Sequence, residues 1–204
     1  CAPTTALAAV QSTTLPQPIT TTATGGANAE ARYELDLNND GQIDVSLGLS
    51  RYSGSYNGLD IESSYIYATA YAYDSLPTPG NGIASQDLTI DTPLGSYTYP
   101  FVQIFAFGEE VGPGARFQAP DYDGAYLAYA LDAQGTYYGT PIDFQSDESL
   151  LAEGHQGYLG VRFQAGGETH YGWLRLSYTC NVGQAPSITV YGYGYDDAAD
   201  TPIA

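Results

Sequence analysis

Apolar and polar positions alternate with a period of two in several segments of the chain. In residues 65–73, Tyr65, Tyr67, Tyr71 and Tyr73 fill all but one of the odd positions, and Ile or Ala fills the even positions. A period of two places successive side chains on opposite faces of a strand. The segment is therefore predicted to be a strand with one aromatic face and one face of small residues. Residues 191–195 repeat the pattern with Tyr and Gly.

Short segments of the same kind continue along most of the chain. The further strand candidates are 33–37, 43–49, 88–92, 99–107, 124–131, 157–164, 171–178 and 187–195. Turn dipeptides such as Asn57-Gly58 and Gly166-Gly167 separate them at short intervals. Only 148–153 has a brief helical pattern, so no helical crossovers are expected. The sequence predicts an all-β fold, an antiparallel β-sandwich or jelly roll.

The first 29 residues differ from the rest because they contain no charged residue and are rich in Thr, Ala and Pro. Their apolar positions Leu7, Val10, Leu15 and Ile19 are too few to form a core, and two prolines exclude a central helix. Residues 1–29 are predicted to be an extended arm, and residues 30–204 a β-sandwich domain. The arm is either a donor strand that adds to a sheet, or a flexible linker or a stalk that carries sugars on Ser and Thr.

Charge excludes several classes of partner. The formal net charge of the 204 residues is -18, and all five cations are Arg. Nucleic-acid binding needs clustered cations, so it is not expected. No stretch reaches the ~18 to 20 apolar residues of a membrane span, so no transmembrane segment is expected. Because the chain has no Met, we expect an exported protein whose signal peptide was removed before Cys1, located outside the cell or on its surface.

An acidic segment between two predicted strands has the spacing of a calcium loop. The candidate ligands are Asp36, Asn38, Asp40, Asp44 and the backbone carbonyl of Gln42. The twelfth position is not Glu, so the bidentate ligand of an EF-hand is missing. The segment predicts a structural Ca2+ site. The alternative is an acidic hairpin with an Asp-Gly turn.

Cys1 and Cys180 are the only cysteines. In an oxidising compartment they are expected to form a disulfide, within one chain or between two. The extended arm reaches up to ~90 Å at ~3.3 Å per residue, so the Cys180 of a neighbouring copy lies within range. A third possibility is that Cys1 carries the lipid of a bacterial surface lipoprotein.

No catalytic signature is found. His155 and His170 lack a metal-ligand spacing, no GxSxG sequence occurs, and neighbouring acids such as Glu109 and Glu110 are expected by chance among 23. We therefore do not expect an enzyme, although a hydrolase with its site among the loop acids is a weaker possibility. Exposed Tyr side chains and Trp173 could instead stack on sugar rings, or could belong to the core and to subunit contacts.

Four segments of the body, 157–163, 169–176, 188–195 and 200–204, resemble those of secreted bacterial proteins of the PEP-CTERM type, with the sequence HYGWLRL as the most specific part. The resemblance covers about 30–204 in outline, without the sorting tail. It implies an exported, β-rich extracellular protein of a Gram-negative bacterium. The uncharged arm is similar in layout to that of donor-strand fibre subunits, in which each arm completes a sheet of the next subunit.

Together these observations predict a structural subunit of an extracellular bacterial filament or surface assembly, which polymerises head to tail with copies of itself through its arm. The alternative is a secreted carbohydrate-binding module with glycans as partners, or a surface lipoprotein.

Overall fold

The computed structural model describes residues 10–24, 28–71, 79–118, 124–152 and 154–204, with the backbone alone for 16–19. These residues form strands, turns and bends and no helix, so none of them belongs to a helix that could cross a membrane. The strands are β1 (Val10–Thr22), β2 (Asn28–Leu35), β3 (Val45–Tyr56), β4 (Leu59–Thr69), β5 (Gly82–Thr92), β6 (Gly95–Val102), β7 (Ile104–Phe105), β8 (Phe117–Gln118), β9 (Ala125–Tyr137), β10 (Thr140–Ser149), β11 (Gly157–Ala165), β12 (Glu168–Thr179) and β13 (Ser187–Asp196).

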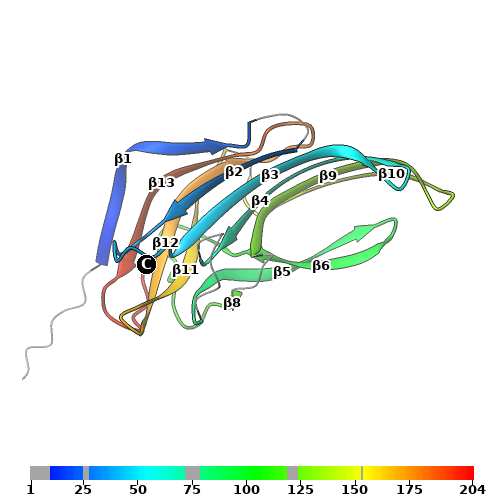
Figure 1. Ribbon diagram of the computed structural model, residues 1–204. Coiled ribbons are helices and arrows are strands. Elements are labelled where there is room, and N and C mark those ends of the chain that lie inside the picture. The colour runs from blue at the N-terminus through cyan, green and yellow to red at the C-terminus, as the bar shows by residue number, and fades with distance from the viewer. Residues whose placement is uncertain (1–9, 25–27, 72–78, 119–123, 153) are drawn as a thin grey trace, which may run out of the picture.

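The strands form one curled mixed sheet, a half-barrel, in the order β1-β13-β12-β11-β5-β6-β9-β4-β3-β2 (Figure 1). Beside this path, β10 pairs with β9, β7 with β11 and β8 with β5. All pairs are antiparallel except the single contact between β6 and β9, where Phe101 faces Tyr126. The long ladders are β1-β13-β12-β11 at one end and β2-β3-β4-β9-β10 at the other, and β5 and β6 connect them.

The two ends of the curled sheet enclose one main hydrophobic core. Buried aliphatic residues from both ends meet there: Leu47, Leu49, Leu127, Leu174, Leu176 and Ile188. Hydrogen bonds also cross this core. The hydroxyl of Tyr178 donates to the carbonyl of Leu127 at 2.9 Å, and the hydroxyl of Ser64 donates to the carbonyl of Gln184 at 3.1 Å. The ends therefore fold as one body.

The predicted all-β fold is confirmed, while the finer sandwich or jelly-roll topology stays a prediction. In β4 the alternation is also confirmed: Ile66 and Ala68 are fully buried in the core, and Tyr65 and Tyr67 lie on the other face. Of the four tyrosines, Tyr73 lies outside the described residues.

Two local predictions have different outcomes. Asn57-Gly58 forms the turn of the β3-β4 hairpin, and Gly166-Gly167 forms the turn of the β11-β12 hairpin. All four residues have positive φ, including the non-glycine Asn57 at 49°. The brief helix predicted at 148–153 is wrong, because β10 continues to Ser149 against β9. Sequence reasoning missed the β9-β10 hairpin, whose turn is Tyr138-Gly139.

Candidate functional site

The described part of the arm is an edge strand. Most of it, Val10–Thr22, is β1, which pairs with β13 of the same chain from Val10 opposite Asp196 to Thr22 opposite Ser187. The register is interrupted between Thr14 and Ile19. Two prolines lie in this interruption, and proline has no N–H to donate to a ladder. After β1, Ala23 is buried in the main core and its N–H donates to the carbonyl of Pro186 at 3.1 Å, and Asn28 and Ala29 begin β2.

The four apolar arm residues have different surroundings. Val10 is 54% exposed, and Leu15 packs half-buried against the main core. Ile19 pairs through its backbone with Val190, and Leu7 lies outside the described residues. The side chains of residues 11–14 are all exposed. Main-chain pairing therefore holds the first half of β1, together with a hydrogen bond that Gln11 Nε2 donates to Asp197 at 3.2 Å, and Leu15 adds an apolar contact.

The first half of β1 lies very close to the glycines of β13. A methyl group on Gly192 would come within 2.6 Å of the carbonyl oxygen of Thr13, and one on Gly194 within 3.0 Å of the carbonyl oxygen of Gln11. Glycine inside a strand often marks such a close backbone approach. The glycines at 192 and 194 thus have a structural reason, since a side chain at either position would meet the main chain of the arm that pairs beside β13.

The acidic segment 36–44 forms the connection between β2 and β3, and its carboxylates accept hydrogen bonds from their own loop. Asp36 accepts from the backbone N–H groups of Asp40 and Gly41, at 3.2 and 2.8 Å. Asp40 accepts from the N–H of Gln42 at 2.8 Å, and Asn38 accepts from the N–H of Asp40 at 3.0 Å. The side chains of Asp36, Asn38 and Asp40 are thus brought to one compact turn.

Asp44 differs from the rest of the loop because it is buried. It accepts a hydrogen bond from the N–H of Leu37 at 2.8 Å. Burial raises its pKa to about 7, and the carboxylates of Asp40 and Asp36 contribute in the same direction. The described residues contain no group of three or more His, Cys, Asp or Glu side chains that could hold a metal ion. Calcium binding therefore stays a prediction for this loop.

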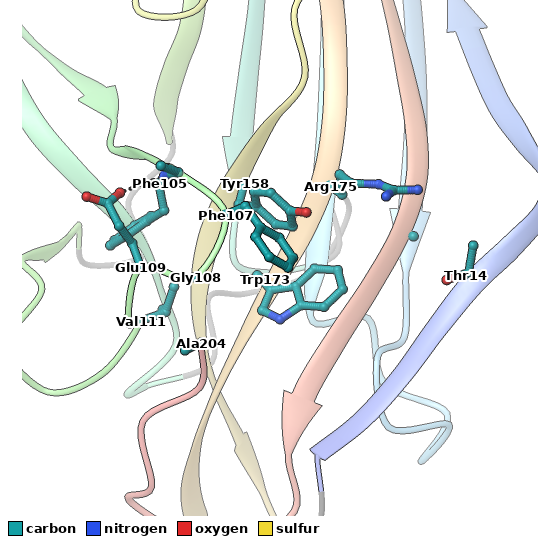
Figure 2. A pocket seen from close by; sticks show the side chains of 12 residues that line it. Thr14, Phe105, Phe107, Gly108, Glu109, Val111, Tyr158, Trp173, Arg175 and Ala204 are labelled. Atoms are coloured by element: carbon teal, nitrogen blue, oxygen red, sulfur yellow. Dashed lines mark hydrogen bonds between the residues drawn. The ribbon is translucent and has the colours of Figure 1, made fainter.

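An aromatic cleft lies on the outer face of the sheet, on the side away from the main core. It has a volume of about 160 Å3. Tyr158 on β11 and Trp173 on β12 meet edge to face, with centroids 5.4 Å apart, and Phe107 lies 6.1 Å from Tyr158. Figure 2 shows these rings close together, with Arg175 and Thr14 on one side of them and Glu109 on the other. The cleft thus brings the arm together with several parts of the body that are far apart in the sequence.

A second aromatic cluster lies where the β5-β6 hairpin meets β4 and β9. Tyr126 contacts Tyr99, Tyr129 and Tyr65 with centroids 5.9 to 6.1 Å apart. Burial raises the pKa of Tyr129 to about 12, and the neighbouring Tyr99 and Tyr65 add to the shift. Only about 100 Å3 of space remains among these rings. This cluster is packing between the hairpin and the sheet.

Cys180 is a free, buried thiol. Its Sγ donates to the carbonyl of Ser64 at 3.3 Å. Burial raises the pKa of the thiol to about 12, and Asp147 adds to the shift. No disulfide is seen among the described residues, and Cys1 lies outside them. Because thiol-disulfide exchange needs a thiolate, the predicted pairing requires the region around Cys180 to open first.

Sequence reasoning did not find the cleft as a site. The sequence left two roles open for Trp173, in the core or in sugar binding. The residue lies half-buried on the outer face of the sheet. Phe107, Tyr158 and Arg175 were not singled out. The usable signal was the alternation in β12, where Leu174 and Leu176 are buried and Arg175 between them faces outwards. Of the two histidines, buried His170 has its Nδ1 3.0 Å from the carbonyl oxygen of Asp196, a contact within the fold.

No protein-family model, curated protein or solved structure matches the chain.

Proposed function

We propose that the protein is a structural subunit of an extracellular bacterial filament, in which the arm of one copy pairs with β13 of the next. The observation that carries this proposal is how β1 is attached. It lies at the edge of the sheet, and its residues 10–14 pair with β13 while their side chains stay exposed. The same strand from another copy would make the same main-chain hydrogen bonds, so exchange costs little contact energy.

The sequence on either side of β1 supports exchange. Gly25 and Gly26 follow the strand in the sequence, and glycine tolerates the varied backbone angles that a change in the direction of the arm would need. The arm is uncharged in a chain of net charge -18. Copies of the body repel each other, so an uncharged strand is the segment best able to join them. Because β13 and the arm are different surfaces, each contact is head to tail and the chain of contacts stays open.

In the same proposal the two facing ends of the sheet act as the layers of a β-sandwich, and the calcium loop stabilises one of them. A cation at Asp36, Asn38 and Asp40 would offset the mutual repulsion of the carboxylates and favour the ionised form of Asp44. Calcium is thus a structural ion in this proposal, and it takes no part in the exchange of the arm.

The test is deletion of residues 1–24 followed by electron microscopy of the secreted material. The cut is placed before Asn28 because Asn28 and Ala29 pair with β3. We expect regular fibres from the full chain, and a folded body without fibres from the truncated chain. Adding a peptide of residues 1–24 to the full chain should shorten its fibres by occupying β13. Fibres formed by the truncated chain would refute the proposal, and so would a full chain that stays monomeric at high concentration.

A further inference from the structure

The aromatic cleft carries an inference independent of assembly. Its floor consists of outward-facing side chains on neighbouring strands, with Tyr158 opposite Arg175 in the β11-β12 ladder. In the neighbouring ladder between β12 and β13, Trp173 lies opposite Gly194 and Arg175 lies opposite Gly192. Because these glycines have no side chains, the indole ring lies directly over Gly194, where an added methyl group would come within 2.9 Å of the ring. The indole ring provides a flat floor, and Tyr158 stands edge to face beside it.

Phe107 stands over this floor and is 88% exposed. Its loop is held in place at several points. The N–H of Ala106 donates to the carboxylate of Glu109 at 2.6 Å, and Val111 forms a β-bridge with Ile203. An exposed phenyl ring on a fixed loop contributes little to folding, because its surface stays in water. A ligand bound in the cleft would cover this ring and remove its surface from water.

Arg175 supplies the charge of the cleft. Its guanidinium lies over the ring of Tyr191, 5.6 Å from the centroid. Stacking uses the flat face of the guanidinium and leaves its in-plane N–H donors available. Over the part of the chain that the structure describes, no carboxylate forms an ion pair with Arg175. The acid that lines the cleft, Glu109, already accepts the hydrogen bond from Ala106.

We propose that this cleft binds an acidic sugar, a pyranose ring that carries a carboxylate. The apolar face of the ring would lie against the indole of Trp173, with Tyr158 beside it and Phe107 above it, and the carboxylate would accept paired hydrogen bonds from Arg175. A cleft of about 160 Å3 is smaller than the pockets that enclose drug-sized ligands, and it suits a single ring. The unpaired guanidinium favours a carboxylated sugar over a neutral one.

The only Trp of the chain, Trp173, lies in the cleft, so its fluorescence reports binding directly. The probe is a trimer of galacturonic acid, compared with the neutral trimer of galactose. A short probe at physiological ionic strength limits repulsion by the net charge of -18. With the full chain we expect a saturable change in Trp fluorescence with the acidic trimer, and an affinity at least tenfold lower for the neutral trimer.

Two substitutions separate the parts of the proposal. Phe107→Ala should weaken binding of the acidic trimer at least tenfold, and Arg175→Gln should abolish the preference for the acidic trimer. Tyr138→Ala and Arg116→Gln are the matched controls, because Tyr138 is 85% exposed outside the cleft and Arg116 pairs with Asp87 at the surface. Both controls should bind normally.

No saturable change with the acidic trimer, or a preference that survives Arg175→Gln, would overturn the proposal. Fibre formation is read separately by microscopy, so failure of either proposal leaves the other intact.

Discussion

Strand β13 has two neighbours, and they are held in different ways. On one side, β12 pairs with β13 and buries Leu174, Leu176 and Tyr178 in the core. On the other side, β1 pairs with β13 over a similar length, but the side chains of its residues 10–14 are exposed; each of the two ladders has one register shift. Both neighbours form ladders of hydrogen bonds, and among the side chains that the structure describes, those of β12 add the extensive burial of apolar surface.

The proposed exchange of β1, and not of β12, follows from this difference. A hydrogen bond exchanged for one with water contributes only about 0.5–1.5 kcal/mol to stability, whereas burying a Leu or Ile side chain contributes about 1.5–3 kcal/mol. The position of β12 is therefore fixed by the core. The position of β1 is fixed mainly by its ladder, which another copy of β1 can reproduce.

The largest expected effect comes from truncating a core residue of β12. Leu174→Ala should lower the free energy of unfolding by about 2–5 kcal/mol, since it leaves a cavity. Thr13→Ala in β1 should change it by no more than about 0.5 kcal/mol, because the side chain is exposed. Denaturant unfolding followed by circular dichroism measures both. Equal losses of stability from the two substitutions would mean that the core holds β1 as firmly as it holds β12, which would contradict this comparison.

The next effect concerns calcium in the body. If the loop 36–44 binds calcium, a free concentration of about 100 times Kd stabilises the fold by about 2.7 kcal/mol. Chelation should lower the Tm equally in the full chain and in the chain that lacks residues 1–24. Asp40→Ala should abolish the effect of chelation, whereas Asp143→Ala, an exposed acid on β10, should preserve it. A Tm that does not respond to chelation would contradict the calcium site.

A smaller effect is expected where the arm approaches β13 closely. Gly192→Ala would place a methyl group 2.6 Å from the carbonyl oxygen of Thr13, so the first half of β1 must move away. We expect faster hydrogen exchange in residues 10–14 and a loss of about 1–3 kcal/mol. Gly114→Ala is the matched control, because a methyl group there meets no atom within 4 Å. Unchanged hydrogen exchange in residues 10–14 would show that β1 does not lie this close to β13.

The smallest effect concerns the tyrosine cluster, which belongs entirely to the body. The pKa of Tyr129 is raised to about 12, above the value of about 10 for an unfolded chain. Its contribution to stability is therefore complete below pH 10 and is lost as the pH rises towards 12. Phenolate absorbance should show a late-titrating group that Tyr129→Phe removes and Tyr138→Phe preserves. Deletion of the arm should leave this titration unchanged, and a shift would mean that the arm supports the cluster.

Much of the fold could be read from the sequence, because alternation and turn chemistry act locally. The two faces of β4 and the Asn57-Gly58 turn follow from such short-range rules. The β9-β10 hairpin was missed because its turn uses Tyr138, a bulky residue with φ 47° that rarely adopts this conformation. The helical pattern at 148–153 was overridden because pairing with β9 extends β10 to Ser149.

The cleft could not be predicted, because its members come from positions far apart in the chain. Phe107 and Tyr158 are brought together only by the pairing of β7 with β11, and Thr14 reaches the cleft only through the ladder between β1 and β13. No local rule specifies those pairings. In contrast, the acidic loop lies within nine consecutive residues, so its candidate ligands could be named from spacing alone.

The most direct test of arm exchange is a disulfide placed across the β1-β13 ladder. The hydroxyl oxygens of Thr20 and Thr189 are 2.9 Å apart, so Thr20→Cys with Thr189→Cys can form a bond when these strands pair. The control is Thr89→Cys with Thr98→Cys, whose hydroxyl oxygens are also 2.9 Å apart within the β5-β6 hairpin. Both variants are made with Cys1→Ser and Cys180→Ser, and the assembled material is run on a denaturing gel without reductant. The account predicts a ladder of covalent multimers for the arm pair and monomers for the hairpin pair. Fibres whose arm pair yields only oxidised monomers would contradict it.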